Sequence, residues 1–301
     1  MCIRDRFVNA EHAREIIFVR GTTEGLNLVA SSYGRHRLKP GDEILVSEME
    51  HHSNIVPWQI IAEQTGSRIR MIPMDDSGQI IQEEYLELLH EKTAIVAITY
   101  VANSLGTVNP IKQMTQRAHD VGAVVVVDAA QAAPHLAIDV RELDCDFLTL
   151  SGHKMYGPTG IGILYGREEL LDAMPPYQGG GEMIKRVTFA GSEYAEIPHK
   201  FEAGTPNIAD SVGFGEAAKL CGISGLMQSR PMNTNYLNTV TSVLKNTAIF
   251  GYLEWHRESL ACLHLRLMVF THTILEPLWI AKVLRFEWGI IVPCPLCSTS
   301  M

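Results

Sequence analysis

The amino-acid sequence predicts an α/β domain with a mostly parallel sheet flanked by helices. Between about residues 15 and 220, short apolar runs alternate with amphipathic, helix-like stretches. Several runs are continuous, such as AVVVVD at 123–128, and continuous β-branched runs are typical of strands buried on both faces. Alternation of such strands with helices indicates a layered α/β domain.

The expected strands follow one another along the chain with turns or helix-like segments between them. The stretch 109–122 predicts a helix that places Ile111, Met114 and Ala118 on one face. In parallel sheets ligands bind beyond the carboxyl ends of the strands, so polar residues at those ends are the candidates for function. The strands are expected at 15–19, 42–47, 68–73, 94–99, 123–128 and 147–151.

Composition excludes several classes of protein. The chain of 301 residues is 46% hydrophobic and 20% charged, as in ordinary globular proteins, and its net charge of -9 argues against a nucleic-acid surface. Six cysteines without regular spacing favour a reducing, cytoplasmic location over a disulfide framework. Cys294 and Cys297 form a single Cys-x-x-Cys pair containing two prolines, which we interpret as incidental, so no metal site is expected. The sequence shows neither a membrane-length apolar run nor the apolar core of a signal peptide.

Lys154 is the first candidate for chemistry. It lies in SGHKMYGPTG, just past an expected strand, beside Ser151 and His153 and before a turn rich in glycine and proline. A lysine in such a bend is usually a surface charge. Lysine is also the residue that forms Schiff bases with carbonyl cofactors, pyridoxal phosphate among them. The residue alone leaves both interpretations open.

Asp128 supplies a partner for such a cofactor. It ends a strand that should be buried, at the edge where ligands bind. A buried carboxylate requires a charged or hydrogen-bonding partner, and a protonated pyridine nitrogen would be one. The ordinary alternative is a helix N-cap. Gln131, three residues on, could reach the same site or complete a capping pattern.

Two further strand ends carry polar side chains. In RGTTEGLNLVA, the hydroxyls of Thr22 and Thr23 stand at the start of a helical pattern, which favours either a phosphate cradle or an ordinary N-cap. In EMEHHSN, one of His51 and His52 could stack on a planar cofactor and exchange protons, although a histidine pair is more often structural. Together with the lysine and the aspartate, these are the parts of a pyridoxal-phosphate site.

The segments that hold these residues resemble the class V aminotransferase-like enzymes, and specifically the group II cysteine desulfurases of the sulfur-mobilisation type. The resemblance covers residues 7–220. It implies the pyridoxal-phosphate-dependent transferase fold of type I, with a mostly parallel sheet of the seven-stranded type, flanking helices and a small C-terminal domain. The matching segments, in the family's order, are RGTTEGLNLVA, MEHHSNIVPW, VDAAQAAPH, DCDFLTLSGHKMYGPTGIGILYG, PPYQGGGEMI and FEAGTPN.

The resemblance assigns a role to each motif around the cofactor ring. It implies that Lys154 holds pyridoxal phosphate covalently and shuttles protons. Asp128 would pair with the pyridine nitrogen, and Gln131 would contact the phenolic oxygen. His51 would stack on the ring and assist proton transfer.

The resemblance also implies a phosphate site, a substrate contact and a dimer. Asn103, in VANSLGT, would lie near the substrate carboxylate. Thr205 would reach the phosphate held by the other subunit, which implies a homodimer. The residues expected around the phosphate within one subunit are Thr23, Ser151 and His153, with Thr22 close by.

The implied activity is conversion of L-cysteine to L-alanine, with the sulfur held as an enzyme persulfide and passed to an acceptor protein for iron–sulfur cluster assembly. L-selenocysteine is the alternative substrate, as in a selenocysteine lyase or another class V enzyme. The other alternative is a non-catalytic fragment prone to misfolding. The resemblance implies neither a nucleic-acid partner nor a membrane partner.

The family's catalytic cysteine segment, Arg-x-Gly-His-His-Cys-Ala, is missing from the C-terminal part of the sequence. From residue 222 onward the chain contains no aspartate, against eleven before it. Shifted by one base, residues 288–296 permit Gly-His-His-Cys-Ala-Met-Pro-Leu, and the stretches 230–236 and 268–274 permit further family segments. We therefore expect an out-of-frame C-terminus and a chain without productive desulfuration. A genuine but divergent C-terminal domain is the alternative.

The expected domain organisation follows from this. Residues 1–6 are interpreted as a non-native leader, because MCIRDR abuts a family segment in the middle of a helix. Residues 7–220 form the large cofactor-binding domain, without the family's N-terminal segment. Residues 221–301 are interpreted as the out-of-frame remnant of the small C-terminal domain.

Overall fold

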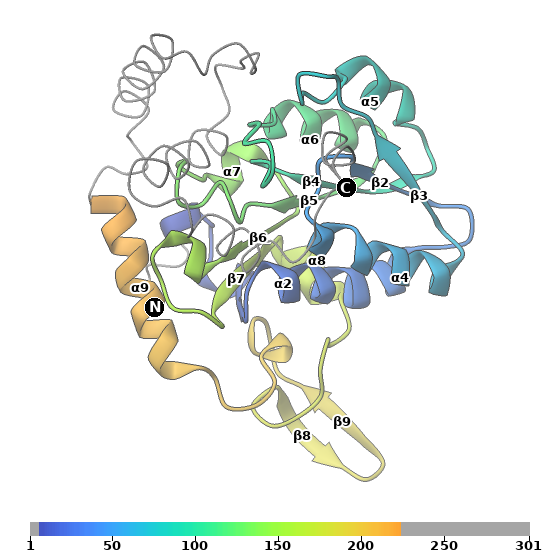
Figure 1. Ribbon diagram of the computed structural model, residues 1–301. Coiled ribbons are helices and arrows are strands. Elements are labelled where there is room, and N and C mark those ends of the chain that lie inside the picture. The colour runs from blue at the N-terminus through green and yellow to red at the C-terminus, as the bar shows by residue number, and fades with distance from the viewer. Residues whose placement is uncertain (1–5, 224–301) are drawn as a thin grey trace, which may run out of the picture.

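A seven-stranded sheet forms the centre of the computed structural model, which describes residues 6–223 (Figure 1). The strand order is β1-β7-β6-β5-β4-β2-β3, and every neighbouring pair from β6 to β3 is parallel. Strand β7 runs antiparallel to both β6 and β1. The prediction of a mostly parallel sheet is therefore confirmed. The strands are β1 Ile16–Val19, β2 Glu43–Ser47, β3 Arg68–Ile72, β4 Thr93–Thr99, β5 Val124–Asp128, β6 Phe147–Ser151 and β7 Gly162–Gly166.

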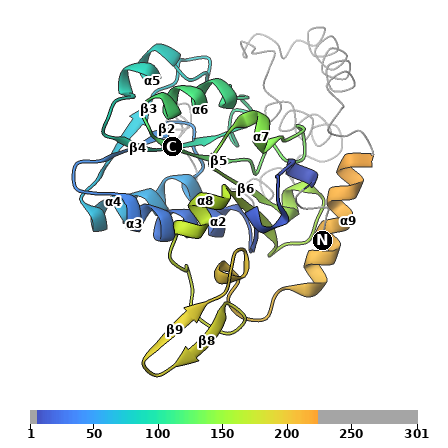
Figure 2. The ribbon, with the colours of Figure 1, turned by 180° about the vertical axis from the view of Figure 1, so that it is seen from behind.

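Helices cover both faces of this sheet. Figures 1 and 2 show α5, α6 and α7 on one face and α2, α3, α4 and α8 on the other. Successive residues of β5 serve the two layers in turn: Val125 and Val127 pack with the first layer, and Val126 packs with the second. The α-helices are α2 Thr22–Leu28, α3 Arg35–Arg37, α4 Val56–Thr65, α5 Gln82–Leu88, α6 Ile111–Asp120, α7 Val140–Leu143, α8 Glu168–Ala173 and α9 Ile208–Ile223; the 3-10 helices are η1 Ala13–Glu15, η3 His52–Asn54, η4 Gly152–Met155 and η5 His199–Phe201, and η2 Val29–Gly34 is a π-helix.

The elements expected from the sequence are present with small shifts at their ends. Each of the six expected strands corresponds to one of β1 to β6, and the expected helix is α6, with Ile111, Met114 and Ala118 buried as predicted. Burial on both faces does not extend to β3, where Met71 is 56% exposed, because β3 lies at the edge of the sheet with one neighbour. The sequence also failed to predict β7 and a hairpin of β8 (Ile184–Thr188) and β9 (Gly191–Tyr194) that projects from the body (Figures 1 and 2).

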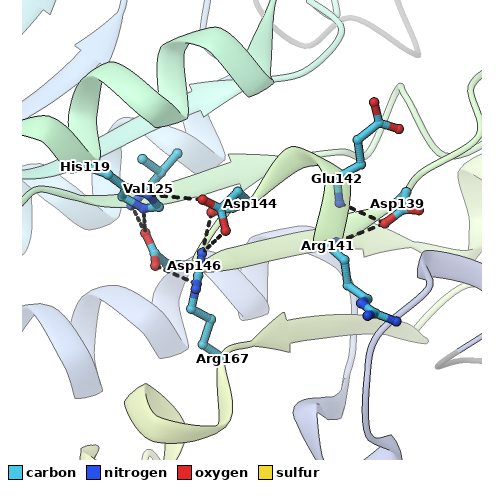
Figure 3. Close-up of polar contacts among 8 residues, drawn as sticks. All are labelled: His119, Val125, Asp139, Arg141, Glu142, Asp144, Asp146 and Arg167. Atoms are coloured by element: carbon cyan, nitrogen blue, oxygen red, sulfur yellow. Dashed lines mark hydrogen bonds and ion pairs between the residues drawn. The ribbon is translucent and has the colours of Figure 1, made fainter.

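Four side chains close the amino-terminal edge of the sheet, and we call them the amino-edge cluster: His119, Asp144, Asp146 and Arg167 (Figure 3). Asp146 precedes β6 and accepts hydrogen bonds from the backbone N–H of Val125 at 2.7 Å and from His119 Nε2 at 2.8 Å. Arg167 Nε lies 2.9 Å from Asp146 Oδ1, and its Nη2 donates to Asp144 at 2.6 Å. The cluster ties α6, β5, β6 and the end of β7 together.

The expected leader and the expected out-of-frame remnant fall almost wholly outside the described residues. The description begins at residue 6 and ends at residue 223, so it includes one residue of the first and three of the second. Within this part of the chain, no helix is long and apolar enough to cross a membrane.

Candidate active site

Several predicted site residues meet at the carboxyl-terminal edge of the sheet, opposite the amino-edge cluster. Asp128 ends β5, Ser151 ends the neighbouring β6, and Lys154 follows in η4. Parallel strands bring their carboxyl ends to one edge, which is why residues far apart in the sequence gather here.

Asp128 is a buried carboxyl with few partners. Its side chain is 4% exposed and accepts one hydrogen bond among the described residues, from the backbone N–H of Ala130 to Oδ1 at 2.9 Å. Burial raises the pKa of Asp128, while that hydrogen bond and the positive charge of Lys154 act in the opposite direction. The carboxylate would therefore be stabilised by a further cationic donor placed in the site.

Lys154 is half-buried and faces two amide side chains. Its Nζ donates to Asn103 Oδ1 at 3.4 Å, and Gln131 Nε2 donates to the same oxygen. Burial lowers the pKa of Lys154, and the charge of Asp128 partly offsets this effect. A lowered pKa leaves more of the amine neutral, which is the form that attacks a carbonyl carbon.

His51 lies at the same edge, as the N-cap of η3. Its Nδ1 accepts the backbone N–H of Ser53 at 3.1 Å, so the neutral ring carries its proton on Nε2. Burial lowers the pKa of His51, followed by the charges of Lys154 and His52. The ring is exposed and largely neutral, as a residue that stacks on a planar group requires.

The expected phosphate cradle is partly assembled. Ser151 Oγ accepts the backbone N–H of Thr22 at 2.8 Å and donates to Thr22 Oγ1 at 3.0 Å. Gly21 is the N-cap of α2 and has φ +149°. A Cβ there would lie 3.0 Å from Ser151 Oγ, so the position favours glycine. Thr23 and His153 are exposed, and burial and Lys154 lower the pKa of His153. Two hydroxyls and a close backbone approach therefore lie at the end of β6.

Thr205 stands apart from the other predicted residues. It lies exposed in the segment between η5 and α9, and no hydrogen bond in the described part of the chain joins it to the rest. Its expected role at another subunit stays a prediction. The structure brings the other predicted residues together in three ways. Hydrogen bonds join Lys154, Asn103 and Gln131, and the charge of Lys154 acts on Asp128 and His51. Ser151 and Thr22 are hydrogen-bonded at the end of β6.

Sequence reasoning missed Glu50, a buried carboxyl beside His51. It is 8% exposed and accepts hydrogen bonds from Ser47 Oγ at 2.5 Å, the backbone N–H of Thr99 at 2.7 Å and Asn54 Nδ2 at 2.7 Å. The available signal was an acidic residue immediately before a histidine pair at a strand end. No group of three or more metal-ligating side chains occurs within residues 6–223.

Comparison with known proteins gives a consistent result. The Aminotransferase class-V family model matches residues 4–293. The cysteine desulfurase of Dickeya dadantii is 53% identical over 212 residues, which are 70% of this chain and 52% of that protein. The cysteine desulfurase of Synechococcus elongatus is 54% identical over 211 residues, which are 34% of that protein. The chain thus spans about half the length, or less, of these curated relatives.

Solved structures show the same likeness. The cysteine desulfurase CsdA from Escherichia coli superposes with a TM-score of 0.78 at 40% identity, covering 81% of this chain and 61% of that one. The apo cysteine desulfurase from Thermococcus onnurineus gives a TM-score of 0.74 at 37% identity, covering 80% and 60%.

Proposed function

The chain belongs to the aminotransferase class-V family, and from that premise we propose that it is a pyridoxal-phosphate-dependent cysteine desulfurase. The observation that carries the proposal is that a half-buried amine, Lys154, lies within the electrostatic influence of a buried carboxyl, Asp128, which accepts one hydrogen bond from the described residues, at the carboxyl edge of the sheet. The relatives with more than half of their residues identical over the matched stretch are cysteine desulfurases, which supports L-cysteine as the substrate.

Pyridoxal phosphate is the cofactor of this family, and the residues present fit it. From residues 6–223 Asp128 accepts one hydrogen bond, from a backbone N–H, and a protonated pyridine nitrogen would supply a cationic donor. The hydroxyls of Ser151 and Thr22 and the bare backbone of Gly21 suit a phosphate, with Thr23 and His153 beside them. When bound, the cofactor withdraws electrons from bonds at the substrate α-carbon.

The chain's own residues would bind the substrate and move its protons. Lys154 Nζ is the group placed to take and return a proton near the α-carbon, because burial favours its neutral form. Asn103 Oδ1 orients that amine by accepting its hydrogen bond, and Gln131 holds Asn103 in turn. His51 would cover the cofactor ring and present an Nε2–H for a further proton transfer.

The partners and location form the finer part of the proposal. We expect a homodimer in which Thr205 reaches the other subunit's phosphate site, and an acceptor protein that carries sulfur to iron–sulfur cluster assembly. Free thiols at Cys145 and Cys221 support a reducing, cytoplasmic location. L-selenocysteine is the competing substrate, and measuring alanine release from both amino acids would separate the two.

The out-of-frame interpretation of residues 221–301 also stays a proposal. The alignments with the two curated relatives run over 211 and 212 residues, close to the length of the 7–220 segment, which supports it. The family model extends to residue 293, which favours the alternative of a divergent C-terminal domain. Sequencing the gene decides between them: a continuous frame without an insertion or deletion near residue 220 would overturn the frameshift.

The cofactor proposal is tested by adding pyridoxal phosphate to the full chain and recording absorbance near the visible edge. We expect a band that Lys154→Ala abolishes and that Lys112→Ala, an exposed lysine paired with Glu142 at 3.4 Å, leaves intact. A band that survives Lys154→Ala, or none in the unaltered chain, would overturn the cofactor assignment. We also expect no productive desulfuration, because the family's catalytic cysteine segment is missing from the sequence. Alanine release from L-cysteine at rates usual for the family would overturn that expectation.

A further inference from the structure

Glu50 is a buried titratable group beside His51, and the proposed reaction gives it no role. Two of the three donors to its carboxyl group are fixed in direction. The backbone N–H of Thr99 can act only as a donor, and Trp58 Nε1 donates to Asn54 Oδ1 at 2.9 Å, which turns the amide nitrogen of Asn54 toward Glu50. The hydroxyl of Ser47 is the one contact among these whose direction can reverse, so a proton on Glu50 has a place to be donated.

We propose that Glu50 is a positioning residue of the cofactor site. Its carboxyl group joins the turn formed by His51 and η3 to the ends of β2 and β4, and it holds a proton while Asp128 stays ionised. The proposal rests on the proposed function, since it is the cofactor that would use His51 and Asp128. Each contact comes from a different part of the edge. Ser47 ends β2, Thr99 ends β4, and Asn54 lies in η3.

Geometry couples Glu50 to Asp128 across one strand. Thr99, whose N–H binds Glu50, is the register partner of Asp128 in the β4–β5 pair. The Thr99 hydroxyl also lies 3.4 Å from the carbonyl oxygen of Asp128, and Tyr100 N donates to that oxygen at 2.9 Å. The two carboxyls are therefore neighbours at the ends of strands in a buried setting, where like charges repel strongly.

The pKa values follow from this arrangement. The pKa of Glu50 is raised from 4.5 to about 8: burial is the largest cause, the charge of Asp128 acts in the same direction, and the three hydrogen bonds act against both. The other titratable groups at this edge are Lys154 and His153 in η4, His51 at the N-cap of η3 and His52 within it; of these, Lys154 favours ionised Asp128. The proton therefore resides on Glu50, and the negative charge on Asp128.

A matched control lies at the start of β2, the strand whose last residue, Ser47, contacts Glu50. Glu43 begins β2 and is also 8% exposed, but it faces cationic partners: His90 Nε2 at 3.1 Å and Arg70 at 3.7 Å. Glu50 faces uncharged donors and an anion. The two glutamates should therefore respond differently when each is replaced by glutamine, which has a similar size and cannot titrate.

The first measurement is the thermal midpoint of the full chain without cofactor, from about pH 5 to about pH 9. The folded-state pKa of Glu50, about 8, lies above its ordinary value of 4.5. Between these two pH values the folded protein keeps a proton that the unfolded chain has released. The stability of the unaltered chain therefore falls as the pH rises from about 4.5 to about 8. The midpoint of Glu50→Gln minus that of the unaltered chain should therefore grow with pH. The Glu43→Gln difference should not grow, and a flat Glu50→Gln difference would overturn the proposal.

A second measurement does not depend on the variant folding. In the unaltered chain with ¹³C-labelled glutamate, one carboxyl signal should titrate near pH 8, and it should shift to lower pH in Asp128→Asn. If no glutamate carboxyl titrates above about pH 6, Glu50 does not hold the proton and the proposal fails.

A third measurement tests the positioning role. Glu50→Ala, which releases the turn, should weaken pyridoxal-phosphate affinity by more than about tenfold, whereas Glu43→Ala, at the far end of β2, should keep it within about threefold. Equal affinities for both variants would contradict the positioning role. If the unaltered chain binds no pyridoxal phosphate, the proposed function fails, and the pH measurements on the cofactor-free chain still test Glu50 by themselves.

Discussion

The two edges of the sheet treat a buried aspartate in opposite ways. Asp146, at the amino edge, accepts a hydrogen bond from a backbone N–H. The imidazole ring of His119 and the guanidinium group of Arg167 also contact it. Asp128, at the carboxyl edge, accepts one backbone N–H and is influenced by Lys154 from a distance at which no hydrogen bond forms. Both side chains are almost completely buried, at 6% and 4% exposure. The difference lies in their partners.

Partner count separates a structural carboxylate from one that is available to a ligand. When one member of a buried ion pair is removed, the charge left behind destabilises the fold. A buried charge that lacks partners costs free energy, and a fold keeps such a group where something else, such as a cofactor, can compensate. At the carboxyl edge Asp128 is such a group, and burial also displaces the pKa values of its neighbours Lys154 and Glu50.

The largest expected effects come from replacing one aspartate at each edge. Asp128→Asn should weaken pyridoxal-phosphate affinity by about a hundredfold, because a charge-assisted contact becomes a neutral one. Asp146→Asn should lower the free energy of unfolding by about 3 kcal/mol, since His119 and Arg167 lose their buried anion, with affinity changed by less than about twofold. Cofactor titration and denaturant unfolding of both variants check this crossed pattern. Equal losses of stability would remove the distinction between the edges.

A smaller effect concerns the pH dependence of stability. The folded-state pKa of Lys154 is lowered by burial from its ordinary value of 10.5, so the folded chain binds fewer protons than the unfolded chain below that value. Lys154→Met should therefore stabilise the cofactor-free protein at neutral pH, and this gain should shrink as pH rises toward 10.5. Lys112→Met, at an exposed position, serves as the control for thermal unfolding across this range. A gain independent of pH would mean that Lys154 is not held in a desolvated site.

The smallest expected effect concerns the phosphate cradle. Gly21 and Gly41 both have positive φ, +149° and +92°, but only at Gly21 would a Cβ approach Ser151 Oγ. Gly21→Ala and Gly41→Ala should each cost about 1 kcal/mol of stability through backbone strain. Only Gly21→Ala should also weaken phosphate and pyridoxal-phosphate binding, by about fivefold. Calorimetry with both anions checks this, and equal affinities for the two variants would count against the cradle.

The sheet could be predicted because its strands are continuous apolar runs. The parallel strands β2, β4, β5 and β6 are buried almost throughout, and burial on both faces leaves a clear signal. Strand β7, GILYG, begins and ends with glycine, and β8 and β9 are almost entirely exposed, so neither pattern separates them from loops. Their pairing is decided by tertiary contacts that a local pattern does not encode.

The gathering of the site residues could be expected because each ends or follows a strand, and parallel strands bring their carboxyl ends to one edge. A lysine and an aspartate at strand ends pointed to a carbonyl cofactor. Glu50 was missed because its significance depends on β4 lying between β2 and β5, which brings Thr99 and Asp128 to it. The amino-edge cluster was missed for the same reason, since His119 and Arg167 lie far apart in the sequence and meet only in the fold.

The most direct test of the central claim is to trap the bond between the chain and its cofactor. The full chain is loaded with pyridoxal phosphate, reduced with borohydride, digested and analysed by mass spectrometry. Reduction converts a Schiff base to a stable secondary amine, so the modified lysine is identified by mass. The carboxyl edge of the sheet predicts the adduct on Lys154 and its disappearance in Lys154→Ala, with Asp128→Asn reducing its yield. An adduct spread over surface lysines, or one that persists in Lys154→Ala, would contradict the assignment of this edge as the cofactor site.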